Sequence, residues 1–169
     1  TTPSYDLETQ IDGEYPWQHI TREMVTSTLS KFHGRIEQVP PAFSACKVDG
    51  KRAYKMARKG KEVELKAKTL VIDEIELLDF NLPEIVVRVV CSKGTYIRAL
   101  ARDIGEALDS GAHLTALRRT RVGDISVEQC EQVDELIHRL HNEEIEIPEE
   151  LVNLTTNKGK NENNEAVSI

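Results

Sequence analysis

The chain contains few cysteines and no long hydrophobic run. Cys46, Cys91 and Cys130 lie far apart, form no CxxC pair and have no metal-ligand spacing with the five histidines, so neither a disulfide framework nor a zinc site is expected. No apolar stretch approaches the roughly 20 residues that span a bilayer, and no signal peptide opens the chain. We therefore expect reduced thiols, no metal, no membrane association and a cytoplasmic location.

Positive charge is also scarce overall, because the 169 residues carry a formal net charge of -7. Taken alone, this value argues against a nucleic-acid partner. The charges are unevenly distributed, however: residues 47–61 contain seven basic residues and one acidic residue, whereas residues 128–150 contain nine acidic residues and one basic residue. The acidic part masks the basic segment in the average, and the sequence is compatible with an RNA-binding surface.

The strongest structural pattern spans residues 85–108. A β-branched run from Ile85 to Val90 predicts a buried strand, Gly94 permits a tight turn and Thr95 is predicted to be a helix N-cap. Apolar residues then recur at helical spacing, namely Ile97, Leu100, Ala101, Ile104 and Leu108. The pattern predicts a strand, a turn and an amphipathic helix with one core-facing stripe.

The start of this predicted helix carries an unusual charge. A helix N-terminus favours acidic residues, but here Lys93 precedes the helix and Arg98 lies in its first turn. A nearby anion, either a phosphate or a carboxylate from elsewhere in the fold, would explain the pattern. The alternative is that Arg98 points into water. Tyr96 by itself is more typical of a packed aromatic side chain than of a catalytic group.

The other elements are predicted from periodicity and turn residues. Thr21 is predicted to cap a helix that ends at Gly34, and Asp49-Gly50 to form the turn of a hairpin. Four further elements are expected: a basic helix over 52–59, one bent strand or two strands over 63–80, a strand over 120–127, and a helix over 132–141. The polar composition from Leu154 onward predicts a disordered tail, so we expect one domain over residues 1–153 and a tail over 154–169.

The basic segment has two interpretations. Its positive charges, together with Phe43 and Tyr54, can bind a nucleic acid through phosphate contacts and stacking. The same residues can equally form an ordinary solvated helix face. His113 alone is more typical of a structural or surface histidine than of a catalytic one.

Three motifs then resemble the TruB-type tRNA pseudouridine synthases. Residues 38–54, QVPPAFSACKVDGKRAY, resemble the Q-x-P-P-x-[YF]-S-A-x-K-x-x-G-x-R-x-Y segment of that family. Residues 91–98, CSKGTYIR, and residues 111–120, GAHLTALRRT, resemble its next two motifs, in the same order. Residues 2–6 match the earlier T-D-T-x-D element less well, because Pro3 stands in place of its Asp. Such long ordered motifs are far more specific than a single glycine pattern.

The resemblance implies an α+β fold, with a mixed, mostly antiparallel sheet and flanking helices. Similar enzymes isomerise one uridine of the tRNA T-loop, at position 55, to pseudouridine. They use neither cofactor nor metal, and they flip the base out of its stack. The implied partner is the T-arm stem-loop of tRNA.

The resemblance also assigns residues to roles. Arg98 would pair with the family's nucleophilic Asp, Tyr96 would lie against the flipped base, and Leu117 would line the uracil pocket. RNA contacts are implied for a basic insertion at about residues 38–61 and for the later motifs. The residues concerned are Phe43, Lys47, Lys51, Arg52, Lys55, Arg58, Lys93, His113, Arg118 and Arg119.

One family motif has no counterpart in the sequence. The nucleophilic Asp of similar enzymes lies in G-x-L-D-P-x-A-x-G, which occurs nowhere in these 169 residues. We therefore expect the C-terminal part of a synthase catalytic domain, inactive alone, that associates through the sheet edge left by the missing segment. The alternative is a stand-alone module that binds structured RNA without catalysis. A regulatory protein-binding domain, without RNA affinity, is a third class.

Overall fold

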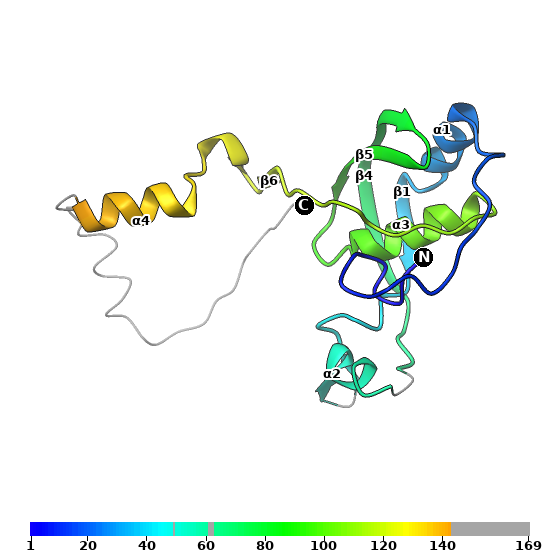
Figure 1. The fold of residues 1–169 in the computed structure, drawn as a ribbon, viewed down its shortest axis with the longest axis horizontal. Helices are drawn as coiled ribbons and strands as arrows, with labels where there is room; N and C mark the ends of the chain where they lie inside the picture. The colour runs from blue at the N-terminus through cyan, green and yellow to red at the C-terminus, as the bar shows by residue number, and fades with distance from the viewer. Residues whose placement is uncertain (49, 61–62, 143–169) are drawn as a thin grey trace. The chain divides into compact units, whose positions relative to one another are not determined.

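The computed structural model describes residues 1–48, 50–60 and 63–142, which form two compact units (Figure 1). The first unit comprises residues 1–118, and the second begins at Arg119. Helices and antiparallel strands are mixed along the chain, so the α+β class expected from the sequence is confirmed. Within the described residues, no helix is both long and apolar enough to cross a membrane.

A three-stranded antiparallel sheet forms the centre of the first unit. Its strands are β1 (Gly34–Gln38), β4 (Lys68–Asn81) and β5 (Glu84–Cys91), in the order β1-β4-β5. The strands β4 and β5 form a long hairpin, and register shifts between Ile72 and Glu74 and between Leu77 and Asp79 interrupt its ladder. Such irregularities bend the strand, which accounts for the bent strand expected here, although the strand begins at Lys68 rather than Val63.

Two helices supply the apolar faces that pack with this sheet. Helix α1 (Arg22–Lys31) begins after Thr21, whose hydroxyl accepts a hydrogen bond from the Met24 amide at 3.2 Å, so the predicted cap is confirmed. Helix α3 (Ile97–Ala107) follows β5 through a tight turn in which Gly94 has a φ of +88°. The buried core consists of Val25, Leu29, Ile72, Cys91, Leu100, Ile104 and Leu108.

The N-cap of α3 is Tyr96, not Thr95 as the sequence suggested. The Thr95 hydroxyl instead donates to the Ser92 carbonyl at 2.9 Å, so it stabilises the turn before the helix. This arrangement places Arg98 within the first turn of α3.

The basic segment forms a small hairpin and a short helix. Strands β2 (Lys47–Val48) and β3 (Lys51–Arg52) pair antiparallel, which confirms the hairpin, although Asp49 lies outside the described residues. Helix α2 (Ala53–Ala57) is shorter than the predicted span of residues 52–59 because Arg52 is its N-cap and Arg58 its C-cap.

The second unit contains only short elements within its described residues. Strands β6 (Arg121–Val122) and β7 (Ile125–Ser126) pair antiparallel, so a turn at Gly123 and Asp124 replaces the single strand predicted over residues 120–127. A 3₁₀ turn, η1 (Val127–Gln129), precedes helix α4 (Val133–Asn142), which matches the predicted helix. The predicted tail over residues 154–169 lies outside the described residues.

Candidate functional site

A loop near the N-terminus holds the carboxylate of Asp6 in a fixed orientation. The Ser4 hydroxyl donates to Asp6 Oδ1 at 2.5 Å, and the Glu8 amide donates to the same oxygen at 2.9 Å. The Thr2 hydroxyl donates to the Asp6 carbonyl at 2.6 Å. The contacts from Ser4 and Glu8 occupy Oδ1 of the carboxylate, and Oδ2 is left to bind a partner from another part of the chain.

That partner is Arg98, which comes from the first turn of α3. Its Nη1 donates to Asp6 Oδ2 at 3.0 Å and to the Ser4 carbonyl at 3.2 Å, and its Nη2 donates to the Phe43 carbonyl at 2.8 Å. The Arg98 and Asp6 side chains are 22% and 26% exposed, so the pair is largely shielded from water. The anion that the sequence predicted beside Arg98 is therefore, among the described residues, the carboxylate of Asp6.

The surroundings of Asp6 favour its ionised form. Partial burial acts to raise its pKa, but the hydrogen bonds from Ser4 and the Glu8 amide, together with the positive charge of Arg98, outweigh burial. The pKa of Asp6 is consequently held below its ordinary value of 3.8. At neutral pH the site contains a carboxylate and a guanidinium in direct contact.

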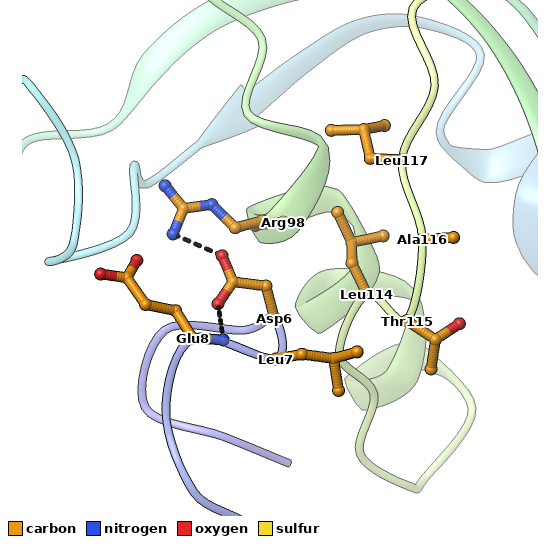
Figure 2. A pocket seen from close by; sticks show the side chains of 8 residues that line it. All are labelled: Asp6, Leu7, Glu8, Arg98, Leu114, Thr115, Ala116 and Leu117. Carbon is orange, nitrogen blue, oxygen red and sulfur yellow. Dashed lines mark hydrogen bonds and ion pairs between the residues drawn. The ribbon is translucent and has the colours of Figure 1, made fainter.

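The ion pair lies at the wall of a pocket of about 360 Å³ (Figure 2). One side comes from the N-terminal loop, with Asp6, Leu7 and Glu8, and the other from residues 114–117, which follow α3. Leu114, Ala116 and Leu117 are apolar. Charged or polar side chains, from Asp6, Glu8, Arg98 and Thr115, also line the pocket, and a concave site that combines apolar walls with a few polar groups is typical of a small-ligand site.

Tyr96 lies two positions before Arg98 in the sequence but does not line this pocket. Its backbone is fixed by Gln38, which accepts from the Tyr96 amide at 2.9 Å and donates to the Tyr96 carbonyl at 3.2 Å. Its hydroxyl lies 3.4 Å from the Cys46 thiol, and the Lys68 ammonium donates to the same sulfur at 3.8 Å. The first predicted motif, residues 38–54, is thus joined to the α3 turn.

Burial and the Cys46 contact raise the pKa of the Tyr96 hydroxyl above its ordinary value. Burial also acts to raise the pKa of the Cys46 thiol, but the hydroxyls of Tyr96 and Ser44 and the charge of Lys68 lower it more strongly. Tyr96 is therefore a neutral phenol at neutral pH.

The predicted RNA-binding residues come from several parts of the chain. Within the basic segment, Lys47, Arg52, Lys55 and Arg58 are exposed, whereas the Lys51 side chain is not among the described groups. Arg58 forms an ion pair with Glu8 at 2.6 Å, which joins α2 to the pocket rim. Phe43 contributes its carbonyl to Arg98, Lys93 is exposed on the turn before α3, and His113 is half-buried. Arg118 ends the first unit and Arg119 begins the second.

Asp6 is the residue of this site that sequence reasoning did not select. The weak match of residues 2–6 to T-D-T-x-D was the available signal, and Asp6 occupies the final position of that element. Along residues 1–48, 50–60 and 63–142, no group of three or more His, Cys, Asp and Glu side chains is arranged to hold a metal ion.

Two family models together match residues 1–154 of the chain. Residues 1–97 match the model described as "TruB family pseudouridylate synthase (N terminal domain)". Residues 98–154 match the model described as "tRNA pseudouridylate synthase B C-terminal domain". The boundary between the two matches falls at the start of α3, between Ile97 and Arg98.

Individual proteins give a consistent result. The chain is 70% identical to tRNA pseudouridine synthase B of Phocaeicola vulgatus over 146 residues, which are 86% of the chain and 62% of the relative. It is 69% identical to the protein of the same name from Bacteroides fragilis strain ATCC 25285 over 147 residues, 87% of the chain and 63% of the relative. The chain therefore spans less than two thirds of these relatives.

A solved structure supports the fold. A chain of the Cbf5-Nop10-Gar1 complex superimposes with a TM-score of 0.57 and 28% sequence identity, over 72% of this chain and 32% of that chain.

Proposed function

Because the chain belongs to the TruB family of pseudouridylate synthases, we propose that it forms the greater part of an enzyme that isomerises a T-loop uridine of tRNA to pseudouridine. The observation that carries this proposal is the Asp6–Arg98 ion pair at the wall of a partly apolar pocket. The pocket joins two segments that match the family, one before β1 and one after α3.

The donors of Arg98 support a role in aligning a second carboxylate. A guanidinium has five N–H groups, and three of them are used by the Asp6, Ser4 and Phe43 acceptors. Among the described residues, this leaves Nε and one hydrogen of Nη2 for a further anion. The nucleophilic Asp that the family resemblance implies would fit this role, and Arg98 would keep that Asp ionised and oriented.

The apolar part of the pocket supports a role in holding the flipped base. Leu117 is 63% exposed and lines the pocket opposite the N-terminal loop. Apolar contact with a uracil ring would cover this exposed side chain. Tyr96 would approach the base from the side of residues 38–54. Because its phenol is neutral, Tyr96 would donate a hydrogen bond to the base, and it could take a proton from carbon 5 only after giving up its own.

The exposed basic residues of the β2–β3 hairpin and α2 support a role in binding the T-arm. Lys47, Arg52 and Lys55 are exposed and lie on β2, β3 and α2, which follow one another closely in the chain. Phosphate contacts of this kind position a nucleic acid without reading its sequence, and folded RNA is recognised mainly through its shape and backbone. The proposal also includes an association of the chain through β1 or β5, the two edges of the described sheet.

Binding of a T-arm stem-loop to this chain tests the proposal. The measurement is NMR titration of the chain with a T-arm stem-loop, compared with the same stem closed by an unrelated tetraloop. We expect T-arm-specific shift changes at Leu117, Arg98 and the α2 segment. Equal changes with both RNAs would favour the stand-alone module that binds structured RNA, and no binding to either RNA would favour the protein-binding domain.

A further inference from the structure

A second arginine on α3 contacts the loop that carries Asp6. Arg102 lies one helical turn after Arg98, so both side chains project from the same face of α3. Its guanidinium carbon lies 5.2 Å from the centroid of the Tyr5 ring, a stacking distance for a cation on an aromatic face. Tyr5 is the residue immediately before Asp6.

Tyr5 has an unusual backbone conformation. Its φ is +59°, a left-handed backbone conformation that residues other than glycine rarely adopt. The conformation is further fixed by the Tyr5 amide, which donates to the Thr2 carbonyl at 3.0 Å, and by the Tyr5 carbonyl, which accepts from the Leu114 amide at 2.9 Å. A change in the backbone conformation of Tyr5 would therefore move both Asp6 and Leu114, which lie on opposite walls of the pocket.

Arg102 is itself held firmly. Its side chain is 16% exposed, its Nη2 lies 2.6 Å from Asp103, and the same nitrogen donates to the Val39 carbonyl at 3.1 Å. Arg102 thus connects three segments: the N-terminal loop, the start of residues 38–54, and α3. Because Arg102 is fixed by contacts within α3 and with Val39, it can hold the N-terminal loop in place.

We propose that Arg102 is a positioning residue for the active site, which holds Tyr5 in its left-handed conformation and thereby orients the Asp6 carboxylate toward Arg98. The effect of this residue on catalysis rests on the proposed function. The structural part of the proposal is that Arg102 and the Tyr5 ring determine the orientation of the Asp6 carboxylate. This part can be tested on this chain without an activity assay.

The first test measures the pKa of the Asp6 carboxyl by carbon-13 NMR in this chain. In Arg102→Met and Tyr5→Leu, we expect the Asp6 pKa to rise toward its ordinary value, because the contact with Arg98 loosens. In Arg35→Met, a matched change of an exposed arginine on β1, the Asp6 pKa should not move. An unchanged Asp6 pKa in folded Arg102→Met and Tyr5→Leu overturns the proposal.

A further variant covers the case in which Arg102→Met does not fold. Glycine adopts a φ of +59° without strain, so Tyr5→Gly should fold. Because it removes the ring that Arg102 contacts, the Asp6 pKa should still rise. Arg102→Met, Tyr5→Leu and Tyr5→Gly, made in the full-length product of the source gene, should lower kcat about ten- to hundredfold, because the Asp6 carboxylate is displaced. The KM for tRNA should stay within about twofold of the parent value, since no RNA contact is removed. If the full-length parent protein is inactive, the proposed function fails while the pKa result still decides the role of Arg102.

Discussion

At the scale of single residues, the site depends on a contact between positions far apart in the sequence. Arg98 could be selected from the sequence because a positive charge in the first turn of a helix conflicts with the helix dipole. Its partner could not, because Asp6 lies 92 positions away and is held by Ser4 and Glu8. A local rule reveals that a charge needs a partner but does not say where the partner lies.

The ionised state of Asp6 gives the chain a specific dependence on acid. Because the pKa of Asp6 is lower in the folded chain than its ordinary value of 3.8, its stabilising contribution is complete above pH 3.8. The contribution is lost as the pH falls through 3.8 and then through the folded-state pKa, since the unfolded chain binds the proton first. Asp6→Asn should lower the free energy of unfolding by about 1–2 kcal/mol at neutral pH, with a smaller difference near pH 3.

Urea unfolding followed through the single tryptophan, Trp17, measures this difference at each pH. Asp73→Asn, a change of an exposed aspartate on β4, serves as the control and should alter stability by less than about 0.5 kcal/mol. A difference for Asp6→Asn that stays constant down to about pH 3 would show that the carboxylate charge does not stabilise the fold.

Arg98 should matter more for turnover than for RNA binding. In the full-length product of the source gene, Arg98→Ala should reduce kcat sharply, and Arg98→Lys should restore little because a lysine lacks the planar fork that binds two acceptors. The affinity for a T-arm stem-loop should stay within a few-fold. Single-turnover kinetics and filter binding measure the two quantities. Equal losses in both would instead identify Arg98 as a phosphate-binding residue.

At the scale of elements, the basic hairpin and helix α2 should contribute through charge. Changing Lys51, Arg52 and Lys55 together to glutamine should weaken T-arm binding and make it less sensitive to salt, by about one unit of the log–log slope for each phosphate that is no longer neutralised. The measurement is the dissociation constant over a series of salt concentrations. Glutamine at Lys31, Arg35 and Lys66, three exposed positions outside this element, is the matched control. An unchanged slope in the first variant would remove the element from the RNA interface.

The end of α3 depends on a glycine for close packing. A Cβ atom at Gly105 would lie 2.6 Å from the Ala112 nitrogen and 2.7 Å from the Gly111 carbonyl carbon. Gly105→Ala should therefore destabilise the chain by about 1–3 kcal/mol, although the same change usually stabilises a helix. Thermal unfolding measures the effect. Glu106→Ala, at an exposed position of the same helix, should have little effect, and a stabilised Gly105→Ala would contradict the packing.

The elements differ in how far they could be predicted. The span from β5 to α3 was predicted well, because a β-branched run, Gly94 and a helical apolar stripe all favour the same structure. The cap at Thr95 was wrong, since the Thr95 hydroxyl bonds to Ser92 across the turn. The strand over residues 120–127 was wrong because Gly123, with a φ of +55°, turns the chain between two short strands. The motifs of the candidate site indicated the pocket, but only tertiary contacts reveal Asp6 and Tyr5 within it.

At the scale of the whole molecule, the chain belongs to the TruB family of pseudouridylate synthases. Its relatives from Phocaeicola and Bacteroides are longer, and the chain covers 62% and 63% of their length. The motif G-x-L-D-P-x-A-x-G, which the resemblance associates with the nucleophile, is absent from the 169 residues. In the proposed function, the described pocket would supply a wall against the base and the arginine that orients a carboxylate, and the proposed chemistry needs that further carboxylate.

The most direct test is a tritium-release assay with the full-length product of the source gene and tRNA labelled at carbon 5 of uridine. We predict release of tritium from wild-type tRNA, none when the T-loop uridine is replaced by cytidine, and strongly reduced release with Arg98→Ala. Tight T-arm binding by the full-length protein without any tritium release would contradict the proposed synthase, and would leave a module that binds structured RNA without catalysis.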